Sequence, residues 1–479
     1  MQGLHTFDPR AKTQIDLESV VEADHILRKI DRLLDMAFVR KLTAACYASG
    51  RGRPPIDPEI YFRMEFLAYL YGIASERRLC EEVRYNLAYR WFCHLPLGEE
   101  VPDHSSLTRI RDRFGEQVFA TVFGEIVRLC KKKGLVNENC RVITDATLIA
   151  ADAALDSLVH NDPEQAQQEA EALEGRTKSI DPPATRKISN QTHTSRTDPD
   201  ATLAQKRGTP RQLKYKVHAT IDADSRVILD TEVTTGARHD NQPYLAQLQR
   251  VQDQHNLRIR EAIADRGYGS ATIIRTLQQQ GIEATLPLWS GRVGNSKYFG
   301  VGLIYEKEHD RFRCPEGKYL NPSPRFYDNY KRYVSSPEDC RACPQASTCP
   351  ARTRTNSQRF VMRSLDQDLF EEVQARMRDP TFGEKMSERM WKIEGLFAEA
   401  KQNHNLARAK YRGRPKVQIQ AYLSAIAQNL KRLVALFYYW LVACWLRKQK
   451  QQVTPLNPIF QNPDFFNTPG GILASPTNP

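Results

Sequence analysis

The sequence lacks an apolar run long enough to cross a membrane as a helix. The longest apolar run, residues 433–446, has 14 residues, whereas a spanning helix needs about 20. Residues 1–15 also lack the apolar segment of a secretory signal. We therefore expect a cytoplasmic protein with no membrane partner. In that compartment the 10 cysteines are buried thiols or metal ligands rather than a disulfide framework.

Two further sequence patterns are missing. No Walker A or dinucleotide-binding glycine pattern occurs, so nothing in the sequence indicates a nucleotide-driven reaction. No internal repeat of useful length occurs either. The 479 residues are enough for two to four domains with a core. Lys and Arg number 69 against 57 Asp and Glu, a net charge of +12, which favours a polyanion such as nucleic acid as the partner. A solvated basic surface explains this charge equally well.

The first 135 residues read as an all-α domain. Apolar residues recur at three- and four-residue spacing over 17–130, with a proline-rich break near Pro54, and Ser75 and Asp103 stand in N-cap positions. The last helix carries three basic residues that suit DNA phosphates or base edges in a helix-turn-helix-like bundle: Arg109, Arg111 and Arg113. A solvated helix face is the competing interpretation.

Residues 136–288 read as α/β. A β-branched strand at 141–150 contains one carboxylate, and residues 214–286 predict a β-hairpin followed by α, β, α and β. Between them, 157–208 contain six Val, Ile or Leu and no aromatic residue, which predicts a flexible insertion. Residues 289–365 predict a small β-rich insertion, 366–448 further helices, and 449–479 a disordered tail.

Three carboxylates border the predicted core. Asp145 interrupts the first strand, Asp265 closes the strand ending Ile263-Ala264, and Glu394 lies inside a helix. A buried charge is costly unless it is paired or binds metal, and Mg²⁺ prefers a few carboxylates with waters and phosphates. Together the three acids predict a hard-cation site, although each alone could be a cap or turn residue.

Basic residues follow the third acid. Lys401 lies seven residues after Glu394, two turns along the same helix face, where it could meet a phosphate. Residues 401–416 contain six Lys or Arg and no acid. This stretch, which includes Arg408, Lys410 and Arg412, predicts a nucleic-acid backbone docked beside the cation site.

The cysteines fall into two groups. Six are scattered through helical or apolar surroundings and read as buried thiols. The other four cluster as Cys-x25-Cys-x2-Cys-x5-Cys, a spacing that suits a closed tetrahedral zinc site: Cys314, Cys340, Cys343 and Cys349. The alternative is a set of reduced thiols that hold no metal.

Several motifs in one order resemble the DDE transposases of bacterial insertion sequences. They are VITDATLIAADA around Asp145, the stretches 197–201, 215–218 and 236–240, IADRGY around Asp265, and IEGLFAEAK from Ile393 to Lys401. Residues 52–58 and 102–107 resemble the helical domain that precedes the catalytic domain in this group. The match covers roughly residues 15–435, and some members also have a cysteine cluster between the second aspartate and the glutamate.

The resemblance implies an RNase H-like mixed sheet with flanking helices, in which Asp145, Asp265 and Glu394 form the catalytic triad. Each acid would bind Mg²⁺ or Mn²⁺, two per active site, and the pair of cations would activate a water or a DNA 3′-hydroxyl for in-line attack on a phosphodiester. The same site would cut and join the element's terminal inverted repeats and target DNA. The resemblance also implies a nucleoid-associated homodimer, because two element ends need two active sites.

The group's signature places a tyrosine and an arginine seven and four residues before the glutamate. Ser387 and Met390 occupy those places here, and Arg389 lies one residue out of register. Two alternatives to an active transposase therefore stay open. One is a decayed or domesticated DNA-binding protein of the same fold, and the other is a nuclease or resolvase that cuts without joining.

Overall fold

The computed structural model describes most of the chain. The described residues are 8, 10, 12, 14–47, 56–167, 188–206, 208–288, 302–327, 329–349, 351–353 and 358–450. The predicted tail at 449–479 lies outside them except for its first two residues. Residues 1–434 form one compact unit and 435–479 a second. Within the described ranges we find no helix with the length and apolarity needed to cross a bilayer.

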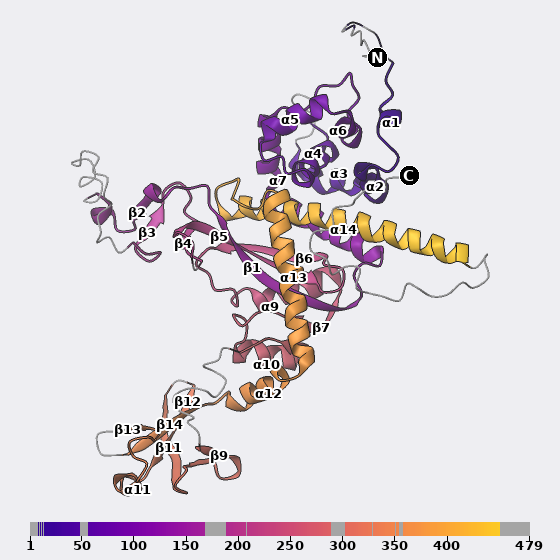
Figure 1. The fold of residues 1–479 in the computed structure, drawn as a ribbon. Coiled ribbons are helices and arrows are strands. Elements are labelled where there is room, and N and C mark those ends of the chain that lie inside the picture. Colours follow the sequence, from indigo (N-terminus) through magenta and orange to yellow (C-terminus); the bar gives the residue numbers. More distant parts are fainter. Residues whose placement is uncertain are drawn as a thin grey trace, which may run out of the picture. The chain divides into compact units, whose positions relative to one another are not determined.

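Helices make up the first part of the chain, as predicted (Figure 1). Ser75 caps one helix by accepting from Arg78 N, and Asp103 caps the last by accepting from Ser105 N. That last helix is interrupted at Gly115, whose φ of 65° and ψ of 177° are not helical. The helices are α1 (Leu17–Val20), α2 (Ile26–Leu33), α3 (Ala37–Thr43), α4 (Pro58–Leu70), α5 (Glu76–Tyr85), α6 (Leu87–Phe92) and α7 (His104–Lys132).

A six-stranded mixed sheet follows. Its strands are β1 (Asn139–Ala150), β4 (Thr202–Ala204), β5 (Gln212–Asp222), β6 (Ile228–Thr235), β7 (Arg258–Ile263) and β8 (Glu283–Thr285). The order is β4-β5-β1-β7-β8, with β6 also paired to β5. β1, β5 and β6 pair antiparallel, whereas β7 runs parallel to β1 and β8 parallel to β7. This order and these directions confirm the RNase H-like mixed sheet.

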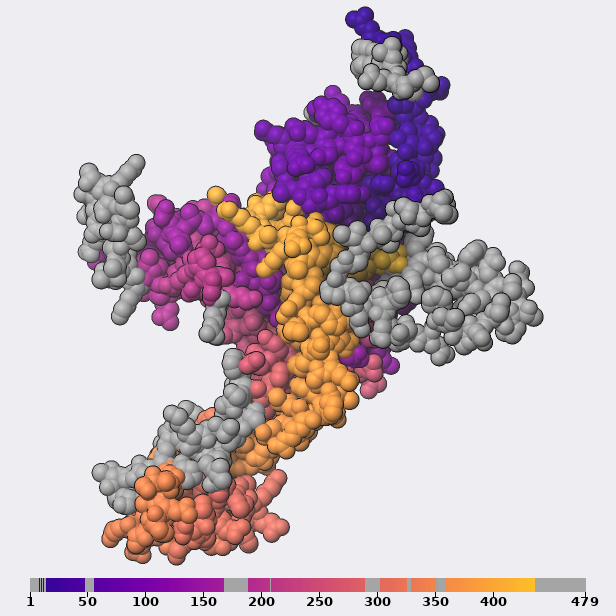
Figure 2. Space-filling view, viewed as in Figure 1, coloured from indigo at the N-terminus to yellow at the C-terminus, as the bar shows by residue number. Residues whose placement is uncertain are grey.

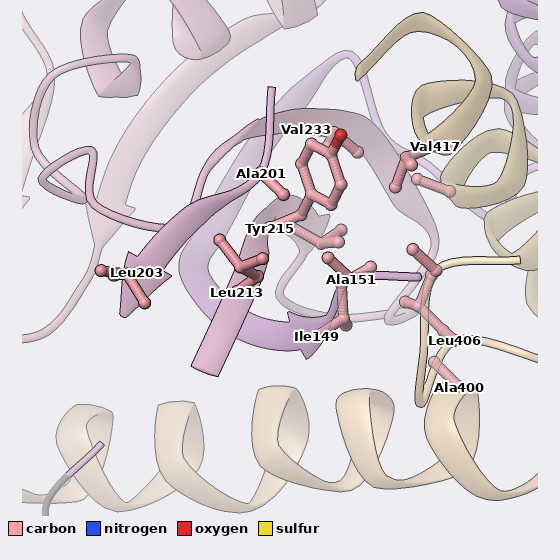
Figure 3. Close-up of a cluster of buried hydrophobic side chains, with 13 residues drawn as sticks. Ile149, Ala151, Ala201, Leu203, Leu213, Tyr215, Val233, Ala400, Leu406 and Val417 are labelled. Carbon is pink, nitrogen blue, oxygen red and sulfur yellow. The ribbon is translucent and has the colours of Figure 1, made fainter. Parts of the chain in front are cut away.

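Helices cover this sheet. α9 (Tyr244–His255) packs against β6 and β7, α10 (Ala271–Gln279) against β8, and α13 (Pro380–Asn403) against β1 and β7. Ile149, Tyr215 and Val233 of the sheet lie in one buried cluster with Ala400 and residues that follow α13 (Figure 3). Their burial fixes the end of α13 against β1 and β5.

The long helix α14 (Arg414–Lys450) protects the edge strand β6. The Gln418 amide accepts from Val233 N and donates to Thr231 O, while the Asn429 amide pairs with both backbone groups of Ile228. These side chains take the place of a further strand at that edge, where unpaired backbone groups would otherwise be left buried.

Part of the predicted flexible insertion is regular structure, which corrects that prediction for the described residues of 157–208. It contains β4, β2 (Leu158–His160) and β3 (His193–Ser195), and β2 pairs with β3. Polar contacts replace the missing apolar ones: Asp198 accepts from Tyr215 Oη at 2.5 Å and from Gly413 N at 3.1 Å. Asp200 accepts from Arg414 N at 2.8 Å and so caps α14.

The insertion after β8 is a second sheet, which confirms its predicted β character. The strand order is β13-β14-β12-β11-β10-β9. Phe312, Leu320, Tyr333 and Val361 form its buried core. The elements are β9 (Ile304–Glu306), β10 (Arg311–Arg313), β11 (Tyr319–Tyr327), β12 (Tyr330–Ser335), α11 (Pro337–Arg341), β13 (Arg352–Thr353) and β14 (Arg359–Ser364), and α12 (Gln367–Met377) then leads to α13.

Candidate active site

Asp145 lies in the middle of β1, opposite Ala219 of β5. Its Oδ2 is 2.7 Å from Arg389 Nη2 of α13, and its Oδ1 accepts from Ala146 N at 2.8 Å. Burial raises the pKa of Asp145 to about 6, against the lowering effect of Arg389, and the charge of Asp265 adds to the rise. The carboxylate therefore lies in a largely buried place where a cationic partner is favoured.

Asp265 lies in the turn that follows β7. Because β7 runs parallel to β1 and pairs with residues 139–143, its carboxyl end brings this turn toward the Asp145 segment. The Asp265 Oδ1 atom accepts from Gly267 N at 2.7 Å. A Cβ on Gly267 would lie 2.9 Å from that same oxygen, so a larger residue there would shift the Asp265 carboxylate from this position.

Glu394 lies on α13, which begins at Pro380 with Asp379 as its N-cap. Two basic side chains fix this helix to β1: Arg389 through Asp145, and Lys401, whose Nζ donates to Thr147 Oγ1 at 2.7 Å. Glu394 lies between them, about 7.5 Å along the axis from Arg389 and on the same face as Lys401. The Glu394 side chain is exposed, and one side of α13 stays at the molecular surface (Figure 2).

Two residues near the acids complete this region. The Tyr268 hydroxyl is buried without a hydrogen-bond partner in the described part of the chain. Burial, together with the charges of Asp145, Asp240 and Asp265, raises the pKa of Tyr268 well above its ordinary value. Asp240 is paired with Lys216 at 2.6 Å. Both residues belong to the motifs quoted above, ADRGY and GARHD; the sequence favours Asp240 equally as a residue that supports the metal ligands and as a capping aspartate, and it singles out no role for Tyr268.

The donor chemistry of this region fits a hard cation. Carboxylates are the ligands that Mg²⁺ prefers, and the buried Tyr268 hydroxyl is a polar atom that lacks a partner beside them. Among the described residues, however, no three His, Cys, Asp or Glu side chains are arranged to hold one metal ion. Arg389 is paired with Asp145 in this arrangement. A metal cation that binds Asp145 must therefore displace Arg389 or share the carboxylate with it.

Arg111, which was predicted to contact DNA, does not lie at the surface. Its side chain is buried, forms an ion pair with Glu76, and lies 4.0 Å from the centre of the Tyr411 ring. Lys410 lies 3.8 Å from the same Glu76. These groups join the helical domain to the loop between α13 and α14, so Arg111 is not available to a nucleic acid. Arg389 is buried as well, in its pair with Asp145.

Four of the other predicted DNA contacts lie at the surface, whereas Lys401 and Lys410 are half-buried. Arg109 and Arg113 are exposed on α7. Arg408 and Arg412 are also exposed, and both pair with Asp152, at 3.0 and 3.2 Å. Exposed ion pairs of this kind are weak and can be exchanged for contacts with phosphate.

Of the four clustered cysteines, Cys340 lies in α11 and the other three lie in loops that join elements of the second sheet. Cys314 and Cys349 both pack against its core, and Lys318 pairs with Asp339 next to Cys340. All four are free thiols, and Cys340 Sγ donates to Ser335 Oγ at 3.1 Å. No three of them form a metal-ligand group in the described chain, so zinc binding here stays a prediction.

Comparison with known protein families gives two matches. Residues 15–113 match the family described as transposase domain (DUF772), and residues 313–434, which include Glu394 and Lys401, match the family described as transposase DDE domain. The first match covers most of the helical domain and the second runs from β10 into α14. The resemblance to the DDE transposases is thereby confirmed, since two separate stretches of the chain match transposase families.

Comparison with individual proteins adds little. No curated protein matches the sequence. Among solved structures, a piggyBac transposase synaptic complex with hairpin DNA aligns over 91% of this chain and 80% of its own, at 10% identity and a TM-score of 0.30. A pre-cleavage Mos1 transpososome aligns over 50% and 61%, at 14% identity and a TM-score of 0.15. A Mos1 mariner paired-end complex with Mn aligns over 56% and 70%, at 14% identity and 0.16. TM-scores this low carry no argument about this chain.

Proposed function

We propose that the chain is a DNA transposase that binds the terminal inverted repeats of an insertion sequence and catalyses metal-dependent strand cleavage and strand transfer. Asp145, Asp265 and Glu394 are the proposed catalytic residues and the ligands of Mg²⁺ or Mn²⁺. The main support is the way β1, β7 and α13 meet: Asp145 is mid-strand on β1, Asp265 lies in the turn after β7, and α13 is fixed to β1 on both sides of Glu394.

Two divalent cations, when bound, would polarise the scissile phosphate and favour the ionised form of the attacking water or 3′-hydroxyl. The three carboxylates would hold those cations at the site where the phosphodiester binds. Because the Glu394 side chain is exposed, a DNA strand has room to approach it. The same residues serve cutting and joining, since both reactions exchange one oxygen at phosphorus for another.

The proposed DNA contacts are Lys401 and the exposed arginines Arg109, Arg113, Arg408 and Arg412. A homodimer is the proposed working form in the nucleoid, because each of two element ends needs one active site. Zinc at the cysteine cluster is a separate proposal. Changing Cys340 and Cys343 to Ser should release about one zinc per chain, and metal analysis that finds no zinc in the wild-type protein would end it.

A cleavage assay tests the proposal. DNA carrying the two ends of the element is incubated with Mg²⁺, Mn²⁺ or EDTA and with wild type or Glu394→Gln. We expect metal-dependent nicking at the ends, lost in Glu394→Gln and kept in Glu384→Gln, a matched change at an exposed glutamate of the same helix. Strand-joined products on an added target plasmid would exclude a nuclease that only cuts.

A DNA-binding protein without catalysis is the second candidate. The ion pair between Asp145 and Arg389 favours it, because it neutralises one of the three acids. Binding of the element ends without cleavage, equal in wild type and Glu394→Gln, would support this candidate and contradict the first.

A further inference from the structure

The edge of β1 that faces β7 is only partly paired. β7 pairs with β1 as far as Ile143, and Ala150 O accepts from Ala409 N at 2.7 Å. Between these points, among the described residues, the bonds at this edge are made by side chains. Ala146 N donates to Asp145 Oδ1, and Leu148 O accepts from Lys401 Nζ at 2.9 Å. Lys401 thus lies where a neighbouring strand would otherwise continue, next to the proposed catalytic carboxylates.

Two neutral oxygens hold the Lys401 ammonium group. One is Leu148 O and the other is Thr147 Oγ1, at 2.9 and 2.7 Å. Thr147 is two residues after Asp145, so both side chains leave the same face of β1. An ammonium group has three donors, and no carboxylate contacts this one in the described part of the chain. One donor and the full positive charge therefore stay available to an anion.

The surroundings of Lys401 are positive as well. Burial, and then the charges of Lys206 and Lys214, lower the pKa of Lys401 below its ordinary value. An arriving anion relieves this repulsion, whereas a further cation increases it. The position favours a phosphate group of a DNA strand that enters the site.

We infer that Thr147 is a positioning residue: its hydroxyl holds the Lys401 ammonium group so that the free donor reaches a DNA phosphate beside Asp145. The inference rests on the proposed function, since it names a residue that serves DNA binding at the same site. A purely structural role for the pair is the competing account, in which Lys401 only closes the edge of β1 and does not contact DNA.

Salt-dependent binding separates these accounts. The affinity of the full chain for a fluorescent duplex of the element end is measured over a series of salt concentrations. The variants are Lys401→Met, Thr147→Val, Thr147→Ser and the double change Lys401→Met/Thr147→Val. Thr121→Val on α7 is the control, because the Thr121 hydroxyl donates to Gln117 O of its own helix and not to a basic side chain in the described part of the chain.

We expect Lys401→Met to reduce the slope of log affinity against log salt by about 1, the effect of one lost phosphate contact. Thr147→Val should weaken binding about fivefold, the effect of one lost hydrogen bond, and Thr147→Ser should restore wild-type affinity. The double variant should bind no more weakly than Lys401→Met, because both changes remove the same contact. Thr121→Val should bind as wild type does.

Three results would overturn the inference. The first is a Thr147→Val variant that keeps the wild-type affinity and salt slope. The second is a Thr147→Ser variant that binds DNA as weakly as Thr147→Val. The third is a double variant in which the losses of affinity of the two single variants add. If Thr147→Val fails to fold, Thr147→Ala is measured against the same serine variant. If the wild-type protein shows no salt-dependent DNA binding, the proposed function itself fails, whereas a loss confined to the Thr147 arm leaves the proposed function standing.

Discussion

Glu394 and Glu399 lie five residues apart on α13 and have opposite surroundings. The Glu399 carboxylate forms ion pairs with Lys431 and Arg432, and its Oε2 is 3.1 Å from Arg432 Nη2. Its Oε1 is 3.4 Å from His404 Nε2. Glu394 is exposed, and no hydrogen bond or ion pair to it occurs among the described residues. An acid whose partners belong to its own chain stabilises the fold, whereas an acid without them is available to a cation or to a substrate.

The same contrast separates the basic residues. Arg111 is buried against Glu76 and Tyr411, while Arg109, two residues earlier on α7, is exposed and donates to Ser105 Oγ at 2.9 Å. The contrast suggests that function is carried by charges that the fold leaves without strong partners. Asp145 is the exception, because it is a proposed catalytic residue and is paired with Arg389.

The largest expected effect is at the metal site. Asp265→Asn should lower the cleavage rate by on the order of 10³-fold or more, because it removes a metal ligand while the amide oxygen can still accept from Gly267 N. Binding of element ends should be unchanged. Cleavage and binding are measured side by side, with Asp253→Asn on α9 as the control, and loss of both activities in Asp265→Asn would indicate a structural aspartate instead.

Arg111→Met should lower the free energy of unfolding by about 3 kcal/mol, since it removes the nearest cation from the largely buried Glu76 carboxylate, which keeps Lys410 at 3.8 Å and hydrogen bonds from Thr108 and Tyr411. Urea unfolding measures the change. Arg109→Met should shift the same quantity by less than about 0.5 kcal/mol. Equal effects at the two positions would break the contrast between buried and exposed arginines.

Glu399→Gln should lower the free energy of unfolding at pH 7 by about 2 kcal/mol, because Lys431 and Arg432 lose their common counter-charge. Burial alone would raise the pKa of Glu399, but His404, Arg432 and Lys431 outweigh it and hold that pKa well below its ordinary value. The stabilisation is therefore complete above about pH 5 and is lost as the pH falls further.

As the pH falls, the free energy of unfolding of the wild type should accordingly decrease more steeply than that of Glu399→Gln. Urea titrations at a series of pH values from neutral to acidic compare the two proteins. Parallel pH profiles would contradict the assigned role of Glu399.

The smallest effect on stability is expected at the surface. Arg408→Gln removes an exposed pair with Asp152 and should change the free energy of unfolding by less than about 0.5 kcal/mol. It should nevertheless reduce the salt slope of DNA binding by about 1. A variant with lowered stability and an unchanged slope would show that Arg408 is structural.

Much of the fold could be predicted from the sequence because local patterns carry it. The β-branched run at 141–150, the hairpin around Asp222 and the glycine turn after Asp265 predict β1, β5, β6 and the end of β7. The prediction that residues 157–208 are flexible was partly wrong, because Asp198 and Asp200 contact residues more than 200 positions away and so order the described part of this segment. Composition does not reveal such contacts.

The candidate site could be predicted only in outline. The acids stood out because each interrupts an apolar pattern. The pairing of Arg389 with Asp145, the burial of Arg111 and the bond from Lys401 to Thr147 depend on side chains that meet only after folding. Thr147 could have been noticed, because it shares a strand face with Asp145.

The most direct test compares Glu394→Gln with Glu399→Gln in metal-dependent cleavage of element ends and in thermal melting. The account predicts that Glu394→Gln loses cleavage and melts as wild type does. It predicts that Glu399→Gln melts at a lower temperature and still cleaves below that temperature. Cleavage that persists in Glu394→Gln and is lost in well-folded Glu399→Gln would contradict the assignment of Glu394 to the active site.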